Sequence, residues 1–335
     1  MLSSQNHNFA YSIDSKILFI DSNDRDISKW PNSSEFEIYC PQVYNNVQSI
    51  NLLNIVLPHN IYNISDYLQN NKLLIDISGI GIKTIILEDG YYSINNLKAS
   101  LEDKIKRDLF VNFTVGYNEV NRKFYFAYSN TSIINSFRLL FDLSSNKQLD
   151  FASSCVTNVN VYSQHSNWGL GYMLGFTKKT YNSQIITDNS TNLTFSYSSN
   201  PWIDSSNVSV IISDYPHTLD ANENIYIDLE KYNKCDEVKP YVSYNYNNTN
   251  SGIVNSAFAK IPNANSNTNN LNLTALLDNE ITSSVSYFKP PIEKIAKLKV
   301  KIRYHNNMLV NLQNANISLS LCINQNVKEF DHVLR

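Results

Sequence analysis

The chain has 335 residues, of which 42% are hydrophobic and 12% aromatic. That is enough apolar material for a packed core, which excludes a wholly disordered chain. The length predicts two domains, because one core rarely grows beyond about 250–300 residues. The 27 basic and 30 acidic side chains give a net charge of −3. This balance lacks the basic field of a strong nucleic-acid binder, so no specific nucleic-acid partner is expected.

Apolar and polar residues alternate with period two along most of the chain. In Glu35–Cys40 the alternation places Phe36 and Ile38 on one face, whereas Asn46–Leu57 is apolar on both faces, as in a strand covered on both sides. Connectors rich in Asn, Ser and Asp separate further expected strands. These are Lys16–Ile20, Leu73–Ile77, Thr84–Leu87, Phe110–Tyr117, Lys123–Tyr128, Phe137–Leu143, Val208–Ser213, Asn224–Glu230, Ser284–Phe288, Lys294–Arg303 and Ile317–Ile323.

One segment has the pattern of a helix. Ser93 offers an N-cap hydroxyl, and apolar residues then recur at helical spacing, which predicts a helix over Ser93–Asp108. Its expected buried residues are Ile94, Leu97, Leu101 and Ile105, and its outer face carries a charge ladder of Lys98, Glu102 and Lys106.

These elements predict an all-β fold with one amphipathic helix, arranged as two antiparallel β-sandwich domains of the jelly-roll kind. The pattern weakens into Asn, Ser and Thr over 182–207, which places the expected domain boundary there. Residues 1–15 are expected to be a polar N-terminal arm, 16–200 an N-terminal sandwich that contains the helix near 93–108, and 201–335 a C-terminal sandwich.

Few side chains suggest a cofactor or a reaction. Only 8 glycines are present, and none lies in a phosphate-binding frame, so no cofactor is expected. The four cysteines, Cys40, Cys155, Cys235 and Cys322, are isolated, which disfavours zinc and redox motifs and predicts reduced thiols. No histidine lies in HExxH and no serine in GxSxG. We therefore expect no catalytic residues and a chain that is not an enzyme.

The richest acidic cluster is Asp21–Asp26. Its alternate oxygens could bind calcium, but Arg25 replaces a ligand, and the turn glycine and distal glutamate of such loops are missing. The sequence instead favours an Asx turn at the strand exit, with Arg25 paired to a carboxylate. No metal site is predicted.

The clearest electrostatic feature is a four-cation stripe, formed by Lys297, Lys299, Lys301 and Arg303 on one face of a single expected strand. Such a stripe could contact an acidic protein surface, anionic lipid or nucleic acid. A solvated face, or lysines that protect a sheet edge from unwanted pairing, is the more common role of such a row.

Seven segments follow one another in a characteristic order. The first is FIDSNDRDISKWPNSSEFEI at Phe19–Ile38, and the others are Asn46–Pro58, Leu87–Asp108, WGLGYMLGF at Trp168–Phe176, Ile225–Asn233, Phe258–Pro262 and Phe288–Ile323. In this order they resemble structural proteins of giant double-stranded DNA viruses. The first segment has Trp30-Pro31-Asn32-Ser33 where the family pattern has a tyrosine-proline corner followed by Asn-Pro.

The resemblance implies a minor capsid protein of the nucleocytoplasmic large DNA viruses, which bridges capsomers through repeated modest interfaces. The implied partners are the major capsid protein and other minor capsid proteins, with a homo-oligomer and proximity to the inner membrane as further options. The first residues lack a basic and apolar signal segment, and no apolar run approaches the ~18 residues of a membrane-spanning helix. We expect a soluble chain made in the host cytoplasm and located in the virion.

Two other functions remain open. A fibre or lectin-like module would grip glycans with an exposed Trp168 or Trp202 beside carboxamides. A β-sandwich glycoside hydrolase would need two carboxylates at about 5–9 Å, a pair that the sequence does not identify.

Overall fold

The computed structural model describes residues 11–58, 61–109, 113–129, 135–142, 162, 167–186, 208–219, 224–238, 254–261, 274–277 and 285–328. Across these ranges the chain forms antiparallel sheets and one substantial helix, so the expected all-β class is confirmed. Among the helices in these ranges, none has both the length and the apolar character needed to cross a membrane.

The chain divides into two compact units, and neither unit is a continuous half of the sequence. The first unit comprises Met1–Ile61, Asn222–Lys239 and Gly252–Arg335, and the second comprises Tyr62–Ala221 and Pro240–Ser251. This differs from the division expected near residue 200. The reason is pairing between the ends of the chain, because the first strands lie in one sheet with the last ones.

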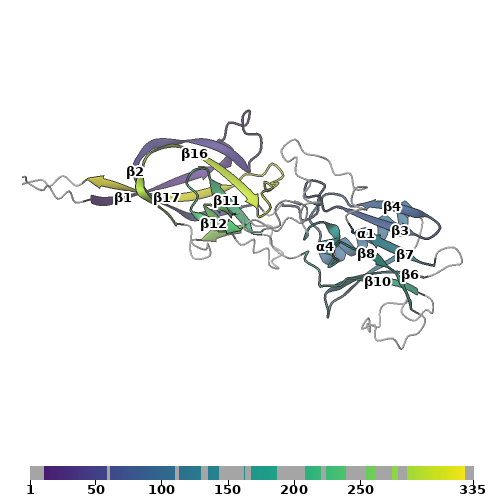
Figure 1. Cartoon of the computed structure of the whole chain (residues 1–335). Coiled ribbons are helices and arrows are strands. Elements are labelled where there is room, and N and C mark those ends of the chain that lie inside the picture. The colour runs from purple at the N-terminus through teal and green to yellow at the C-terminus, as the bar shows by residue number, and fades with distance from the viewer. Residues whose placement is uncertain are drawn as a thin grey trace, which may run out of the picture. The chain divides into compact units, whose positions relative to one another are not determined.

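The first unit is built on a seven-stranded sheet of order β1-β17-β2-β16-β11-β14, with β15 also paired to β2 (Figure 1). A two-stranded sheet of β12 and β13 belongs to the same unit. The bounds are β1 Tyr11–Asp21, β2 Glu35–Leu57, β11 Ile225–Leu229, β12 Cys235–Val238, β13 Val254–Ala257, β14 Ala259–Ile261, β15 Thr274–Leu277, β16 Val285–Tyr304 and β17 Ser318–Lys328. A short 3-10 helix, η1 (Ser22–Asp24), follows β1.

The strands β2 and β16 are each longer than the sequence pattern indicates. The strand β2 contains two segments that were expected as separate, Glu35–Cys40 and Asn46–Leu57. The strand β16 likewise contains Lys294–Arg303 and, from residue 285 onward, the expected strand Ser284–Phe288. The pairing of β16 with β2 shifts register between Tyr287 and Ile292 and again between Ile295 and Lys297. Such bulges let a strand continue through residues that break its alternation.

One face of this sheet forms the core of the unit. Phe36, Val300 and Leu229 lie opposite one another across β2, β16 and β11, and all three are buried. Because side chains alternate along a strand, the residues between them project from the other face. That other face carries the four-cation stripe.

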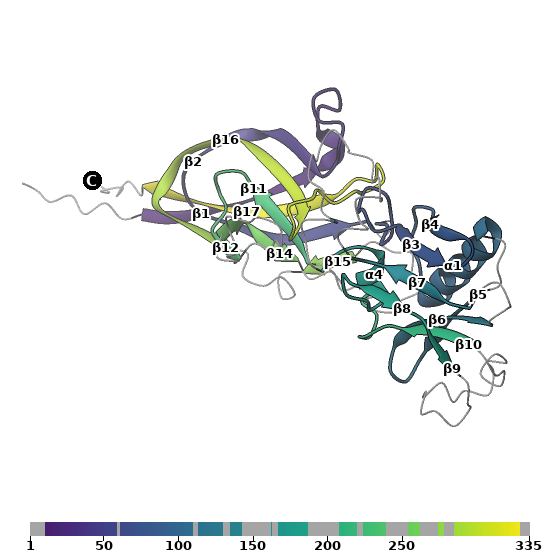
Figure 2. The ribbon, with the colours of Figure 1, turned by 45° about the vertical axis from the view of Figure 1, so that its right-hand side comes forward.

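The second unit contains two four-stranded sheets, β4-β3-β7-β8 and β5-β6-β10-β9 (Figure 2). Side chains of both sheets and of α1 share one buried core, so the unit is a sandwich with a helix. The bounds are β3 Lys72–Ile77, β4 Gly81–Ile86, α1 Ile94–Leu109, β5 Phe113–Asn118, β6 Lys123–Ser129, β7 Phe137–Leu140, α4 Leu170–Met173, β8 Thr180–Asn182, β9 Gln184–Ile186 and β10 Val208–Ile212.

The helix α1 begins where its capping signal predicts. The hydroxyl of Ser93 accepts the backbone N–H of Asn96 at 3.3 Å, and Leu97, Leu101 and Ile105 are buried in the core. The expected charge ladder differs at Glu102, whose carboxylate accepts the backbone N–H of Val115 in β5 at 3.3 Å. A neighbouring strand therefore uses this acid in place of the helical ladder.

Two of the few glycines are required by the backbone beside α4. Gly169 and Gly175 have φ values of 101° and 89°, a region that favours glycine. A Cβ at Gly175 would also lie 2.1 Å from the carbonyl oxygen of Tyr215. The segment 168–176 therefore depends on glycine at both ends.

Candidate functional site

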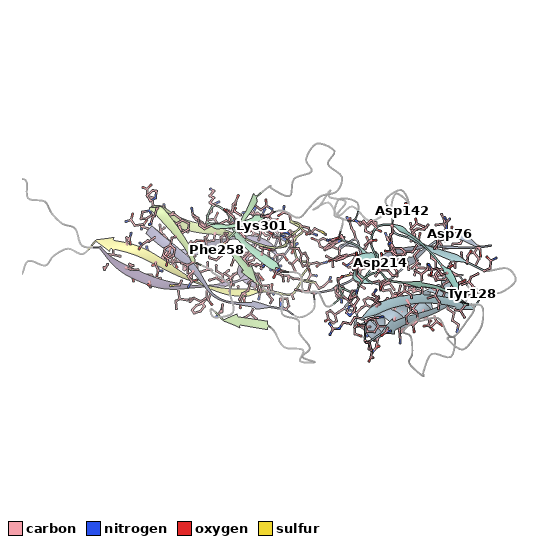
Figure 3. The ribbon with its side chains drawn as sticks, turned by 60° about the horizontal axis from the view of Figure 1, so that its bottom comes forward. Asp76, Tyr128, Asp142, Asp214, Phe258 and Lys301 are labelled. Atoms are coloured by element: carbon pink, nitrogen blue, oxygen red, sulfur yellow. The ribbon has the colours of Figure 1, made fainter. Side chains whose placement is uncertain are left out.

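The four-cation stripe lies on β16, which is an interior strand between β2 and β11. The partner β11 covers β16 only over Val300–Tyr304, so edge protection is wrong for Lys301 and Arg303. Among the described strands, β16 pairs at Lys297 with β2 alone, and edge protection there stays a prediction. The register places Glu35, Lys301 and Asp228 directly opposite one another across the three strands. Each cation of the stripe therefore has acidic neighbours within the same sheet (Lys301 is labelled in Figure 3).

The three lysines form ion pairs with two glutamates of β2. The Nζ atom of Lys297 lies 2.9 Å from Oε2 of Glu37. The Nζ atoms of Lys299 and Lys301 lie 3.0 and 3.3 Å from Oε1 of Glu35. Lys299 also lies over the Trp30 ring, 4.9 Å from its centroid. Trp30 belongs to the corner at which the sequence departs from the family pattern, and its ring helps to fix the position of Lys299.

Burial alone raises the pKa of Glu35, but the hydrogen bond from Lys299 and the charge of Lys301 outweigh it, so that the pKa is lowered overall. The pKa of Lys297 is raised by the hydrogen bond and the charge of Glu37. Both directions favour the ionised forms. Each of the three lysines therefore has a carboxylate partner within the chain, and the two glutamates leave this part of the stripe with a net charge of +1.

Arg303 ends the stripe in a buried ion cluster. Its side chain is 5% exposed, and its guanidinium donates to both carboxylate oxygens of Asp228, at 2.8 and 3.2 Å. The Nη2 atom also donates to Oε2 of Glu237 on β12 at 2.7 Å, and the guanidinium lies 5.2 Å from the Tyr226 ring centroid. One cation thus joins β16, β11 and β12.

The second oxygen of Glu237 contacts Nδ1 of His305, and the Glu237 side chain is only 4% exposed. Burial raises the pKa of Asp228 and outweighs the hydrogen bonds from Arg303. The two carboxylates and one guanidinium together leave a net charge of −1.

A half-open hollow of about 320 Å³ adjoins this cluster and is lined in part by Tyr226, Cys235, Glu237, Lys260 and His305. Burial raises the pKa of the Cys235 thiol, and its Sγ atom lies 3.5 Å from the carbonyl oxygen of Phe258. A raised pKa keeps the thiol protonated and weakly nucleophilic. Of the two acids that line the hollow, Asp236 and Glu237, the second is already held by Arg303 and His305.

The Asp21–Asp26 loop contains the expected Asx turn, because Oδ1 of Asp21 accepts the backbone N–H of Asn23 at 2.8 Å. The prediction that Arg25 pairs with a carboxylate is wrong. Its guanidinium donates to the carbonyls of Ser22, Trp30 and Pro31 and to Oδ1 of Asn316. The turn leaves these carbonyls without strand partners, so the guanidinium fork satisfies them. Within the described ranges, no group of three or more His, Cys, Asp or Glu residues could hold a metal ion.

Two tryptophans and four cysteines were also named from the sequence. The indole N–H of Trp168 donates to the carbonyl of Leu68 at 2.5 Å, and Trp202 lies outside the described residues. Trp168 is thus engaged in packing within the second unit. Cys40, Cys235 and Cys322 are free thiols, and Cys155 lies outside the described residues.

The structure also shows a feature that the sequence pattern missed. On β1, the side chains of Ile13, Ile17 and Phe19 are 61%, 56% and 76% exposed. On β4, Ile82 and Ile86 are likewise exposed. Both strands stand at the end of their sheets. A clue existed in 13–20, where both faces carry large apolar residues, but the position of a strand within its sheet is not a local property.

A family model described as "Family of unknown function (DUF5901)" matches residues 10–116, which is less than half of the chain. No curated protein matches. Among solved structures, the mavirus penton protein is similar with a TM-score of 0.42 and 13% identity, over 94% of this chain and 100% of that one. A chain of the Sputnik virophage structure is similar with a TM-score of 0.39 and 11% identity, over 93% of this chain and 98% of that one. Both scores lie below 0.5, and neither similarity assigns a role to a residue of this chain.

Proposed function

We propose that this chain is a non-enzymatic structural protein of a virus particle, a minor capsid component that bridges major capsid capsomers through protein–protein contacts. The observation that carries the proposal is an exposed apolar edge strand in each of the two units. These strands are β1, with Ile13, Ile17 and Phe19, and β4, with Ile82 and Ile86.

An exposed apolar edge strand is a hazard for a protein that acts alone. Its unpaired backbone groups and apolar side chains form a template for association, and monomeric proteins usually disrupt such edges with charges, prolines or bulges. Burial of one such side chain against a partner contributes about 1.5–3 kcal/mol. Two edges on separate units allow one chain to hold two neighbours, and modest contacts then add through effective concentration.

The four-cation stripe is not required for this role. Its cations are paired with Glu35, Glu37, Asp228 and Glu237, so a partner that used the stripe would compete with acids of the same chain. Contact of the stripe with a partner or with the inner membrane stays a prediction. The proposed partners are the major capsid protein and other minor capsid proteins, in a particle assembled in the host cytoplasm.

Quantitative mass spectrometry of purified particles tests the proposal. We expect this chain to be present in a fixed molar ratio to the major coat protein after extensive washing. A chain absent from particles, or present in a ratio that varies between preparations, would overturn the structural role.

A further inference from the structure

We propose that the edge strand β1 (Tyr11–Asp21) pairs in an antiparallel manner with β1 of a second copy of this chain, about a two-fold axis through Ser15. The inference rests on the proposed function, because it names the partner of one of its two contact strands. On its inner side β1 pairs with β17 along its whole length, from Tyr11 opposite Lys328 to Asp21 opposite Ser318. In the described part of the chain, no strand lies on the outer side.

Two copies of the β1 sequence complement each other when a two-fold axis at Ser15 relates them. In an antiparallel pair, directly opposite residues project from the same face, so a two-fold axis perpendicular to the sheet must pass through a residue position. With the axis at Ser15, Asp14 of one copy lies opposite Lys16 of the other, and Ile13 lies opposite Ile17. Tyr11 then lies opposite Phe19. Symmetry produces each of these pairs twice.

Neighbouring registers lose this match. An axis at Asp14 places two aspartates opposite each other, and an axis at Lys16 places two lysines opposite each other. Like charges at directly opposite positions are destabilising, whereas opposite charges and large apolar pairs are stabilising. Charge complementarity therefore selects the register centred on Ser15.

The exposure of the side chains agrees with this arrangement. Ile13, Ile17 and Phe19 share one face of β1 and are mostly exposed, whereas Leu18 and Ile20 on the other face are buried in the first unit. In the paired strands, Ile13 and Ile17 of the two copies would form two adjacent apolar rows. The Asp14 carboxylate already lies 3.6 Å from Nζ of Lys16 in its own strand, so two copies would bring four alternating charges together.

A second copy suits this edge better than an unrelated strand, because one short sequence satisfies both sides of the contact. A two-fold contact is isologous, so every favourable pair appears twice and the assembly closes as a dimer. The dimer would form one continuous sheet from the seven-stranded sheets of two chains.

Charge reversal gives the primary test, measured on the full chain by sedimentation velocity and by light scattering over a range of concentrations. We expect the unmodified chain to dimerise and D14K or K16D alone to raise the dimer dissociation constant about tenfold, because each places like charges opposite each other twice. The exchange D14K/K16D should restore the dimer. An equimolar mixture of D14K and K16D chains should form a heterodimer, because one copy then supplies two cations and the other two anions, which form two oppositely charged pairs across the contact.

Crosslinking tests the register. S15C places two cysteines opposite each other at the axis, so mild oxidation should give a covalent dimer. S12C places its cysteine opposite Leu18 of the other copy and far from the cysteine at position 12 of that copy. It should therefore give no more covalent dimer than the unmodified chain, which has only its native thiols. Circular dichroism checks that each variant is folded, as expected for positions with exposed or half-buried side chains.

A monomer at every concentration, or a dimer insensitive to charge reversal and to mixing, would overturn the inference. Capture of β1 by a different particle protein, with the chain monomeric in its absence, would also overturn it. The proposed function fails separately. A monomeric chain found in particles in a fixed ratio removes only the self-pairing, whereas a chain that dimerises through β1 but is absent from particles removes only the virion role.

Discussion

The strands β16 and β1 belong to the same sheet and have opposite relations to their surroundings. On β16, the four cations Lys297, Lys299, Lys301 and Arg303 each have a carboxylate partner within the chain. On β1, three large apolar side chains remain exposed. The difference follows from the neighbouring strands: β2 places Glu35 and Glu37 beside the lysines of β16, whereas no described strand lies on the outer side of β1. A charged row is therefore a weak sign of a partner, and an apolar row at an edge is a stronger one.

The largest expected effect comes from the buried end of the stripe. Arg303→Met leaves Asp228 and Glu237 without their cation, and an uncompensated buried charge typically costs about 3–5 kcal/mol. We expect a loss of that size in the free energy of unfolding, measured by urea denaturation. Neutralising both acids in R303M/D228N/E237Q should recover part of it.

The matched control is Arg138→Met. Arg138 pairs with Asp76 in the second unit, but its side chain is 49% exposed, so removal of the pair should cost less than about 1 kcal/mol. A similar loss for R303M and R138M would show that the Arg303 cluster does not stabilise the first unit.

The second prediction compares two adjacent residues of β1. Leu18→Ala removes a buried side chain and should cost about 2–5 kcal/mol of unfolding free energy. Phe19→Ala removes a side chain that is exposed in the single chain, so its cost should stay within about 0.5 kcal/mol. Both values come from urea denaturation at a concentration at which the chain is monomeric. Equal losses at the two positions would contradict the assignment of Phe19 to an open face.

The sequence predicted the faces of these strands but not their neighbours. Alternation alone separates Lys299 and Lys301 from Val300 and Ile302, which are buried as expected. The ion pair of Lys301 with Glu35 joins residues that are far apart in the chain, and it depends on strand order, which alternation does not encode. The same reasoning applies to β1, whose two apolar faces gave no indication of which one is open.

Local signals were most informative where they were self-contained. The helix expected over Ser93–Asp108 is observed over Ile94–Leu109, because a cap and a helical period act within a few residues. The strand β12, which carries Glu237, was missed because Cys235–Val238 has little apolar alternation. The sequence therefore predicted the cations of the candidate site, and only the structure identified the acids that pair with them.

The third prediction uses the pH dependence of stability to measure the contribution of the Glu35 ion pairs. The pKa of Glu35 is lowered from its ordinary value of 4.5 in the folded chain. Its pairing therefore contributes stability above pH 4.5 that is lost as the pH falls through the lower folded value. We expect Glu35→Gln to cost about 1 kcal/mol at pH 7 and the difference from the unmodified chain to shrink in acid. A difference that stays constant from pH 7 to pH 3 would contradict this, and Glu293→Gln, at an exposed position on β16, provides the control.

The smallest expected effect is at the exposed end of the stripe. The Lys297 side chain is 57% exposed, and such a surface pair contributes little to stability because solvent screens it and side-chain entropy opposes it. Lys297→Gln should therefore leave the midpoint of urea denaturation unchanged. It should also leave the amount of chain in purified particles unchanged, if contacts at β1 and β4 hold it there. A marked loss from particles with stability intact would mean that a partner binds Lys297 more strongly than Glu37 does, and the contrast between an internally satisfied β16 and an open β1 would no longer hold.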